Sequence, residues 1–193
     1  METRVQILKA ARAAFDKLGA EGLSMRAIAK TVGITPMAIY RHYESKQGLI
    51  DALVMDALDE WSAIVAKIAP APPLEWLARI GAAHLQFALT RPRRYEAAFL
   101  LHSSKARRYP DDFIAGRSPV GRLQMELIDT LMQEGVFKAG SAIEVYVMMA
   151  ALSQGLITLY RAGRVAGGES EFRNFYSKAM QRCSESFRVG KDK

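Results

Sequence analysis

Apolar residues recur three and four positions apart along most of the chain, which is the spacing of one face of an α-helix. The first such stripe consists of Ile7, Leu8, Ala11, Ala14, Phe15 and Leu18. No segment alternates apolar and polar residues with a period of two for long enough to predict a β-strand. The pattern therefore predicts an all-α protein.

Capping residues, glycines and prolines divide this pattern into about nine helices. Ser24 is a predicted N-cap, Gly33 ends the helix that follows it, and Thr35 with Pro36 starts the next one. Residues 102–118 are rich in Ser, Gly, Pro and basic residues and predict a long connection. The helices are expected up to residue 18 and over about 25–32, 36–42, 46–68, 74–90, 92–101, 119–134, 141–163 and 168–188.

The composition is that of a globular protein with a basic excess. The 193 residues are 50% hydrophobic and 24% charged, with a formal net charge of +7. Residues 1–50 contain eight basic and four acidic residues, so more than half of the excess lies in the first quarter of the chain. Anionic membranes and acidic metabolites attract the same charge, but its concentration makes the N-terminal quarter the candidate for binding nucleic acid.

Several classes of protein are excluded by simple features. Cys183 is the only cysteine, which rules out an intrachain disulfide and fits a reducing cytoplasm. The N-terminus has no apolar core or cleavage site of an export signal. The longest uncharged run, Val145–Tyr160, falls short of the roughly 20 apolar residues that a membrane span needs. We interpret that run as a buried helix and expect a cytoplasmic protein without a membrane partner.

The segment Ser24–Lys46, SMRAIAKTVGITPMAIYRHYESK, has the spacing of a helix-turn-helix. Two short capped helices flank a turn that begins at Gly33, and no acidic residue occurs from Thr35 to Tyr43. The second helix of such a motif enters the DNA major groove, so its outward residues must be small, polar or basic.

These residues resemble the DNA-binding domain of the TetR family of bacterial transcriptional regulators over residues 3–50. The resemblance implies a three-helix DNA-binding domain over residues 1–48 and a larger helical effector-binding and dimerisation domain over 49–193. It implies a core of Ile28, Ala29, Ile34, Ile39, Tyr43 and Leu49. It also implies phosphate contacts from Thr35, Tyr40, His42 and Lys46, and groove or base contacts from Arg26, Met37, Ala38 and Arg41.

The apolar pair of Pro36 and Met37 near the start of the recognition helix favours contact with thymine methyl groups over hydrogen-bonded readout. Short capped helices also occur in many other helical proteins, and Tyr40 and Tyr43 at helical spacing could be core residues. The resemblance implies a ligand-responsive repressor that binds a palindromic operator. It also implies a bacterial cytoplasmic protein that is associated with the nucleoid. A ligand-independent architectural DNA-binding protein remains the alternative.

For a small-molecule effector, which the sequence does not identify, we expect a cavity lined by apolar side chains and a few polar ones. The candidates are Trp61, His84, Phe87, Phe99, His102, Met125, Met149 and Gln154, each of which could instead be a core residue. Residues 87–92 before Tyr95 and the string Ser153-Gln154-Gly155 resemble a subgroup of the family that usually has histidine where this chain has Gln154, and the exchange removes a titratable group. The basic residues between 91 and 108 could attract an anionic effector or form a solvated surface.

The last two long helices carry apolar residues around more of their circumference than the core of one subunit would cover, which predicts a homodimer interface. A thick monomeric core is the other interpretation. The candidate interface residues are Tyr146, Ala150, Leu156, Ile157, Tyr160, Phe172, Phe175 and Tyr176. The three histidines lack the spacing of metal ligands. We find no catalytic motif and expect neither a metal, a cofactor nor an enzyme.

Overall fold

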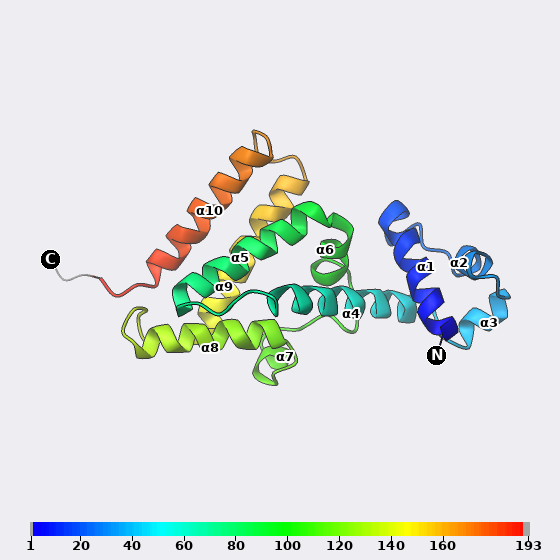
Figure 1. Cartoon of the computed structure of the whole chain (residues 1–193), viewed down its shortest axis with the longest axis horizontal. Coiled ribbons are helices and arrows are strands. Elements are labelled where there is room, and N and C mark those ends of the chain that lie inside the picture. The colour runs from blue at the N-terminus through cyan, green and yellow to red at the C-terminus, as the bar shows by residue number, and fades with distance from the viewer. Residues whose placement is uncertain (1, 191–193) are drawn as a thin grey trace. The chain divides into compact units, whose positions relative to one another are not determined.

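A computed structural model describes residues 2–190, and within that range it contains ten helices and no strand (Figure 1). The all-α prediction is confirmed. The helices are α1 (Glu2–Leu18), α2 (Met25–Val32), α3 (Pro36–Tyr40), α4 (Lys46–Val65), α5 (Pro73–Thr90), α6 (Pro92–Phe99), α7 (Asp111–Ile114), α8 (Pro119–Gln133), α9 (Ala142–Arg161) and α10 (Glu169–Ser186).

The additional helix is α7, which lies in the segment predicted to be a connection. A four-residue helix is too short to show an apolar period, so the pattern could not reveal it. It is held by Asp112, whose carboxylate accepts hydrogen bonds from the Arg108 amide at 2.6 Å and from Nε of Arg117 at 2.7 Å. α3 and α4 end two and three residues before the predicted positions, because the chain turns after Tyr40 and after Val65.

The helix starts follow the predicted capping. Oγ of Ser24 accepts a hydrogen bond from the Ala27 amide, and Oγ1 of Thr35 accepts one from the Ala38 amide. Gly33 adopts the left-handed conformation with φ 77°, and its amide bonds back to carbonyls at the end of α2. These local contacts set the sharp turn between α2 and α3.

The described chain forms two compact units. The first contains residues 2–63 and 90–106, and the second contains residues 64–89 and 107–190. In the first unit α1 packs on α2 and α6, and α2 packs on α3. In the second unit α9 packs on both α8 and α10. The first unit therefore extends beyond residue 48 and takes in most of α4 and all of α6.

Each unit has its own apolar core. The first is built around fully buried side chains including Ile7, Phe15, Ile28, Ile39, Leu49, Leu53 and Tyr95. The second is built around Ile80, Ile128, Phe137, Ile157 and Phe172. In the second unit the residues after α8 and after α10 also pair through backbone hydrogen bonds, from Lys138 to Phe187 and from Val189 to Val136.

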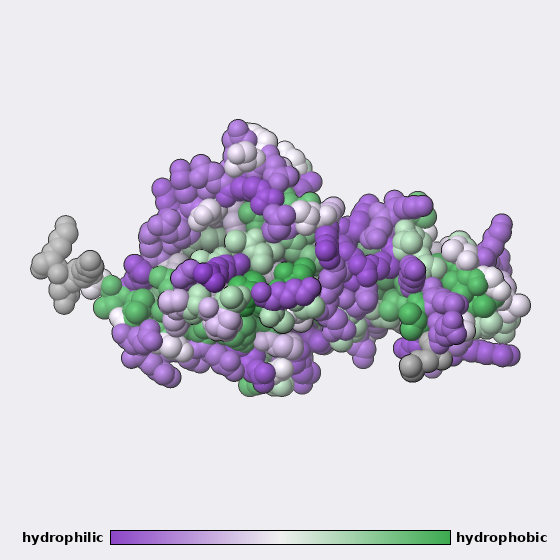
Figure 2. All heavy atoms as spheres, in the orientation of Figure 1, coloured by the Kyte–Doolittle hydropathy of each residue, from purple (hydrophilic) through white to green (hydrophobic). Residues whose placement is uncertain are grey.

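α9 has more exposed apolar surface than predicted. The expectation of a buried helix over 145–160 is wrong for much of its circumference, since Met148 is 56% and Leu159 43% exposed. Among the described residues α9 is the one helix long and apolar enough to cross a membrane by length and composition, and 22% of its most apolar window is buried. Figure 2 shows hydrophobic patches, coloured green, on a largely hydrophilic face of the molecule.

Candidate nucleic-acid interface and ligand cavity

The side chains predicted to contact DNA all reach the protein surface. None of the eight is fully buried: Ala38 and His42 are partly covered, and Arg26, Thr35, Met37, Tyr40, Arg41 and Lys46 are exposed. Met37 is 75% exposed, which is unusual for so large an apolar side chain and leaves its thioether available to a partner. We call these eight residues the N-terminal surface.

Two members of the N-terminal surface are held by contacts within the chain. The Thr35 hydroxyl accepts the Ala38 amide at 3.1 Å, which leaves its own hydrogen available for a phosphate oxygen. Nζ of Lys46 donates to the carbonyl of Glu21 at 3.3 Å, and its remaining hydrogens face outward. Both groups can thus donate to DNA without giving up the contacts that orient them.

The residues predicted to form the core beneath this surface lie inside the first unit. Ile28, Ala29, Ile39, Tyr43 and Leu49 are all buried, and Ile34 is only partly covered. The Tyr43 hydroxyl donates to the carbonyl of Arg4, and the Arg4 guanidinium lies 5.1 Å from the centre of the Tyr43 ring. α1 is thereby fixed against the residue that follows the recognition helix α3.

An ion-pair cluster joins α1, α4 and α6 within the first unit. Arg94 from α6 is only 5% exposed, and it donates to Asp56 at 2.5 Å and to Glu60 at 2.6 Å, both on α4. Arg12 from α1 contacts Glu60 at 3.1 Å and Asp56 at 3.7 Å, and Arg91 also pairs with Glu60. We call these five residues the Arg94 cluster.

The opposite charges of the Arg94 cluster stabilise one another in a partly buried site. Burial alone would raise the pKa of Glu60, but hydrogen bonds from Arg94 and Arg91, with the added charge of Arg12, hold that pKa below its usual value. Nη1 of Arg94 has no hydrogen-bond partner among the described residues. The buried guanidinium therefore depends on the two carboxylates.

The structure shows how three of the basic residues between 91 and 108 are used. Arg91 and Arg94 pair with Glu60, and Arg93 pairs with Glu96 at 2.8 Å. Arg91 and Arg94 link the start of α6 to α4, and Arg93 pairs within α6, so these three arginines form neither a purely solvated surface nor a free anion site. The sequence pattern could not show the links of Arg91 and Arg94, since their acidic partner Glu60 lies 31 and 34 residues away in α4.

A second polar link holds α4 to the residues after α6. The Asp51 carboxylate accepts hydrogen bonds from the hydroxyls of Ser103 at 2.7 Å and Ser104 at 2.6 Å, and from Nε2 of Gln47. Burial would raise the pKa of Asp51, yet these donors lower it overall. The first half of α4 is thus tied through Asp51 to the residues after α6, and the second half is tied through Asp56 and Glu60 to Arg94 of α6.

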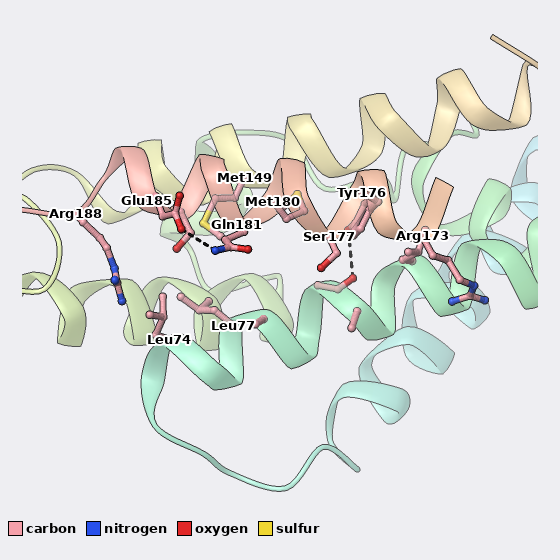
Figure 3. A pocket seen from close by; sticks show the side chains of 15 residues that line it. Leu74, Leu77, Met149, Arg173, Tyr176, Ser177, Met180, Gln181, Glu185 and Arg188 are labelled. Atoms are coloured by element: carbon pink, nitrogen blue, oxygen red, sulfur yellow. Dashed lines mark hydrogen bonds between the residues drawn. The ribbon is translucent and has the colours of Figure 1, made fainter. Parts of the chain in front are cut away.

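The second unit contains a cavity of about 530 Å³ between α5, α9 and α10. Its volume lies within the range of small-molecule sites. Its apolar lining consists of Leu74, Leu77, Ala78, Gly81, Ala82, Leu85, Met149 and Met180. Its polar lining comes from α10 and the residues after it: Arg173, Tyr176, Ser177, Gln181, Ser184, Glu185 and Arg188 (Figure 3).

A chain of hydrogen bonds runs from the cavity wall into the core of the second unit. The Tyr176 hydroxyl donates to the Gly81 carbonyl at 3.2 Å and lies 2.6 Å from Oγ of Ser153, which lies 2.8 Å from Nδ1 of His84. Since Tyr176 has one hydroxyl hydrogen, Ser153 donates to Tyr176 and the Nδ1–H of His84 donates to Ser153. Desolvation by burial lowers the pKa of His84 to about 4, so its ring is neutral near pH 7.

The structure brings few of the eight predicted effector residues together. Met149 lines the cavity, and His84 reaches its wall through Ser153 and Tyr176. Trp61 and Phe99 contact each other edge to face within the first unit. The others line no part of this cavity: Phe87 is buried, His102 is exposed, and Met125 and Gln154 are partly covered.

The residues predicted to form the dimer interface differ in how much of each side chain is exposed. Leu156, Ile157, Phe172 and Tyr176 are buried within their own chain. The ring of Tyr160 stacks on Phe172 with centroids 4.0 Å apart, Tyr146 packs against Phe113, and Ala150 is partly covered. Phe175 is 50% exposed and is the member of this set available to a partner. Tyr146 is buried enough that desolvation raises its pKa to about 12.

Sequence reasoning did not identify the polar wall of the cavity or the Arg94 cluster. The α10 wall repeats at helical spacing but mixes charged, hydroxyl and apolar residues, a pattern that resembles a solvated helix face. The partners of Arg94 are distant in sequence. Among the described residues no group of three or more His, Cys, Asp or Glu side chains could hold a metal ion.

Comparisons with known proteins give matches to both the N-terminal and the C-terminal part of the chain. The model of the bacterial regulatory proteins of the tetR family matches residues 7–53, and the model of the tetracyclin repressor-like C-terminal domain matches residues 77–182. The class A tetracycline repressor protein from transposon 1721 of Escherichia coli is 26% identical over 166 residues, which cover 84% of this chain and 69% of that protein.

Two further relatives match the N-terminal part alone. The regulator UidR of Escherichia coli K12 is 43% identical over 53 residues, which are 28% of this chain and 27% of that protein. TtgR of Pseudomonas putida is 44% identical over 59 residues, which are 31% of this chain and 28% of that protein. These matches span less than a third of the length of either relative.

Solved structures share the whole fold at low identity. A Rhodococcus protein of unknown function superposes with a TM-score of 0.77 at 20% identity, covering 97% of this chain and 95% of that one. A TetR transcription regulator from Haloarcula marismortui gives 0.72 at 17% identity, covering 97% and 99%. RolR in complex with resorcinol gives 0.69 at 14% identity, covering 98% and 89%. At such identities the likeness shows the fold alone.

Substitution of Arg94 and of Arg12 in the Arg94 cluster should lower the stability of the fold by unequal amounts. Arg94→Met should lower the free energy of unfolding by about 3 kcal/mol, because it leaves partly buried carboxylates without their main partner. Arg12→Gln should lower it by less than about 1 kcal/mol, because Arg12 is 42% exposed and its carboxylates keep Arg94. Urea denaturation of both variants beside the parent measures the difference. Equal losses would show that burial of Arg94 does not set the strength of the cluster.

The buried His84 predicts a loss of stability in mild acid. Its folded pKa of about 4 lies below the ordinary value of 6.5, so the unfolded chain takes up the proton first and stability falls as the pH drops through this interval. Between pH 7 and pH 5 the loss should be about 2 kcal/mol. Urea denaturation at both pH values measures it.

The matched variant for this experiment is His84→Asn, whose amide can still donate to Ser153 but does not titrate. The pH dependence should shrink in the variant, while the exposed His102 and the partly covered His42 remain in both proteins. At pH 5 the lowered carboxylate pKa values of Asp51 and Glu60 contribute little, because those groups lose stability only in stronger acid. An unchanged pH dependence would show that His84 is not the group responsible.

Proposed function

The chain belongs to the TetR family of bacterial transcriptional regulators, and on that premise we propose that it is a ligand-responsive repressor that binds a palindromic operator as a homodimer. The observation that carries the DNA-binding part is the N-terminal surface. It presents basic, hydroxyl and exposed apolar side chains on a capped α2–turn–α3 unit. Such a unit can place α3 in the major groove.

Within this proposal the members of the N-terminal surface have different roles. Thr35, Tyr40, His42 and Lys46 hold phosphates, and Arg26, Ala38 and Arg41 face the groove. Met37 contacts base edges, because a 75% exposed apolar side chain on α3 gains most from a thymine methyl group. Phosphate contacts supply affinity for any sequence, and base contacts distinguish one sequence from another.

A small-molecule effector and repression are supported by the cavity and by relatives. The cavity of about 530 Å³ in the second unit offers a place for a ligand, and RolR, which shares the fold, was solved with resorcinol. One sequence relative is a tetracycline repressor protein. We place the protein in the cytoplasm beside DNA, with regulation and not catalysis as its activity.

The Arg94 cluster and the Asp51 contacts support a route for the response. They tie α1, α4 and α6 into the same compact unit as the N-terminal surface. A ligand that favours a different position of α4 or α6 would therefore move the recognition helix as well. Because coupling is reciprocal, DNA must weaken ligand binding by the same factor by which the ligand weakens DNA binding.

Homodimer formation is supported by a stripe of exposed residues on α9. Met148, Ala151, Gly155 and Leu159 recur at helical spacing and are all exposed, and Phe175 on the adjacent α10 is 50% exposed. Small residues at 151 and 155 allow a helix of a second subunit to approach closely. An isologous contact of this kind gives two recognition helices related by a two-fold axis, which matches a palindromic site.

The direct test of the function is protection of DNA that flanks the gene encoding this chain. We expect a protected palindrome whose half-sites are about one helical turn apart, roughly 34 to 36 Å between centres. Lys46→Ala should then weaken binding to the operator and to random DNA alike and reduce the slope of log affinity against log salt by about 1, because one phosphate contact is lost. Met37→Ala should weaken binding to the operator several-fold and leave random DNA unaffected.

The control for charge is Lys67→Ala, which removes an exposed lysine outside the N-terminal surface. It should leave both the affinity and the salt slope as in the parent. Circular dichroism of each variant verifies that the helices remain. If Lys46→Ala keeps the parent's salt slope, Lys46 does not hold a phosphate. If Met37→Ala weakens random DNA as much as the operator, Met37 does not read bases.

The dimer is tested by Gly155→Arg, which places a charge on the exposed stripe. A Cβ at Gly155 meets no atom within 4 Å, and arginine is a better helix former than glycine, so the monomer should keep its fold. Light scattering should show the mass fall from twice 21.4 kDa to 21.4 kDa, and operator affinity should fall with it. The matched variant Arg122→Glu alters an exposed residue of α8 and should remain dimeric. A dimeric Gly155→Arg protein would place the interface elsewhere.

A further inference from the structure

The cavity between α5, α9 and α10 is long and changes chemically from one end to the other. The polar wall runs along α10 from Arg173 to Glu185, which is roughly 18 Å at 1.5 Å per residue, and continues to Arg188 after the helix. Leu77, Met149 and Met180 line the part between these arginines (Figure 3). The shape suits an extended molecule with an apolar body more than a compact polar one.

Arg188 places an uncompensated positive charge at one end. None of the ion pairs between described residues involves Arg188. Its side chain reaches from the end of α10 toward the start of α5 (Figure 3). Its backbone is fixed by the hydrogen bonds that flank it, from Lys138 to Phe187 and from Val189 to Val136. The backbone thus carries the Arg188 side chain, which is exposed, to the end of the cavity, and no ion pair of Arg188 is formed with the residues 2–190 that the structure describes.

The other charged groups of the lining are already engaged. Arg173 pairs with Glu169 at 2.7 Å. The Glu185 carboxylate accepts a hydrogen bond from Nε2 of Gln181 at 2.8 Å, which turns it toward the preceding turn of α10 and away from Arg188. Glu185 keeps its negative charge, because an amide donor is neutral, whereas Arg188 is the cationic side chain of the lining that forms no ion pair with the described residues.

The opposite end of the cavity offers little for a polar head group. The Tyr176 hydroxyl donates its hydrogen to the Gly81 carbonyl and accepts from Ser153, so it is satisfied without a ligand. Burial raises the pKa of Tyr176, which keeps it protonated and uncharged. A ligand with one anionic end would therefore bind in one direction.

We propose that this cavity binds an elongated apolar monocarboxylate, with its carboxylate at Arg188 and its alkyl chain between Leu77, Met149 and Met180. A guanidinium binds a carboxylate through two parallel hydrogen bonds, and the apolar walls stabilise the chain by removing it from water. A ligand of this class acts as an effector only if the protein is the ligand-responsive regulator proposed above. The binding itself does not require DNA.

The test compares three probes of equal chain length on the full-length protein: decanoate, 1-decanol and decylamine. Titration calorimetry without DNA should show that decanoate binds most tightly and decylamine least. Arg188→Gln should weaken decanoate roughly tenfold and leave 1-decanol unchanged, because the variant loses a charged hydrogen bond but none of the apolar wall. The matched control, Arg182→Gln, removes an exposed arginine of α10 that does not line the cavity and should bind decanoate as the parent does.

A blocking variant locates the bound chain. Ala78→Phe adds a ring at an exposed position of the cavity lining, where the fold should tolerate it, and should abolish decanoate binding while circular dichroism stays unchanged. Persistent binding in Ala78→Phe, equal binding of all three probes, preference for decylamine, or no binding of decanoate would each overturn the proposal. DNA binding by the ligand-free protein is measured separately, so a failure of the ligand class leaves the DNA-binding proposal standing, and the reverse also holds.

Discussion

The first unit depends on one buried guanidinium. Arg94 is almost completely removed from water, and it is stable there because Asp56 and Glu60 accept its hydrogen bonds. The same carboxylates bind Arg12. The negative charges that compensate the buried Arg94 guanidinium of α6 therefore also hold α1. α1 in turn carries the carbonyl and guanidinium that hold Tyr43 behind the recognition helix. A movement of α6 that separated Arg94 from Asp56 and Glu60 would leave a buried charge unpaired, which favours α1, α4 and α6 keeping their positions relative to one another.

The second unit has a comparable polar chain with neutral members. His84, Ser153 and Tyr176 come from α5, α9 and α10, and their hydrogen bonds fix the relation of three helices whose contacts are otherwise apolar. The chain ends at the Gly81 carbonyl in the cavity wall, so the wall and the core of this unit share one network. A satisfied buried network of this kind favours a single packing of the helices. The cavity keeps its shape for the same reason.

Charge is used differently in three places. On the N-terminal surface basic side chains are exposed and available to phosphates. In the Arg94 cluster they are paired inside the protein and serve structure. At Arg188 an exposed guanidinium lines the end of a cavity with apolar and polar walls and forms no ion pair with the described residues. The net charge of +7 therefore does not describe a single binding surface, and each arginine has to be interpreted from its partners.

The sequence by itself determined the features that depend on near neighbours. Helix period, the caps Ser24 and Thr35, the turn at Gly33 and the exposed face of the helix-turn-helix all arise from contacts within a few residues, and the structure has them where the pattern predicts. Only the tertiary structure decided the pairing of Arg94 with α4, the depth of His84 and the use of the mixed α10 face as a cavity wall. Those features join residues tens of positions apart, and burial by a distant segment changes the energy of a charge or a hydroxyl without leaving any local pattern in the chain.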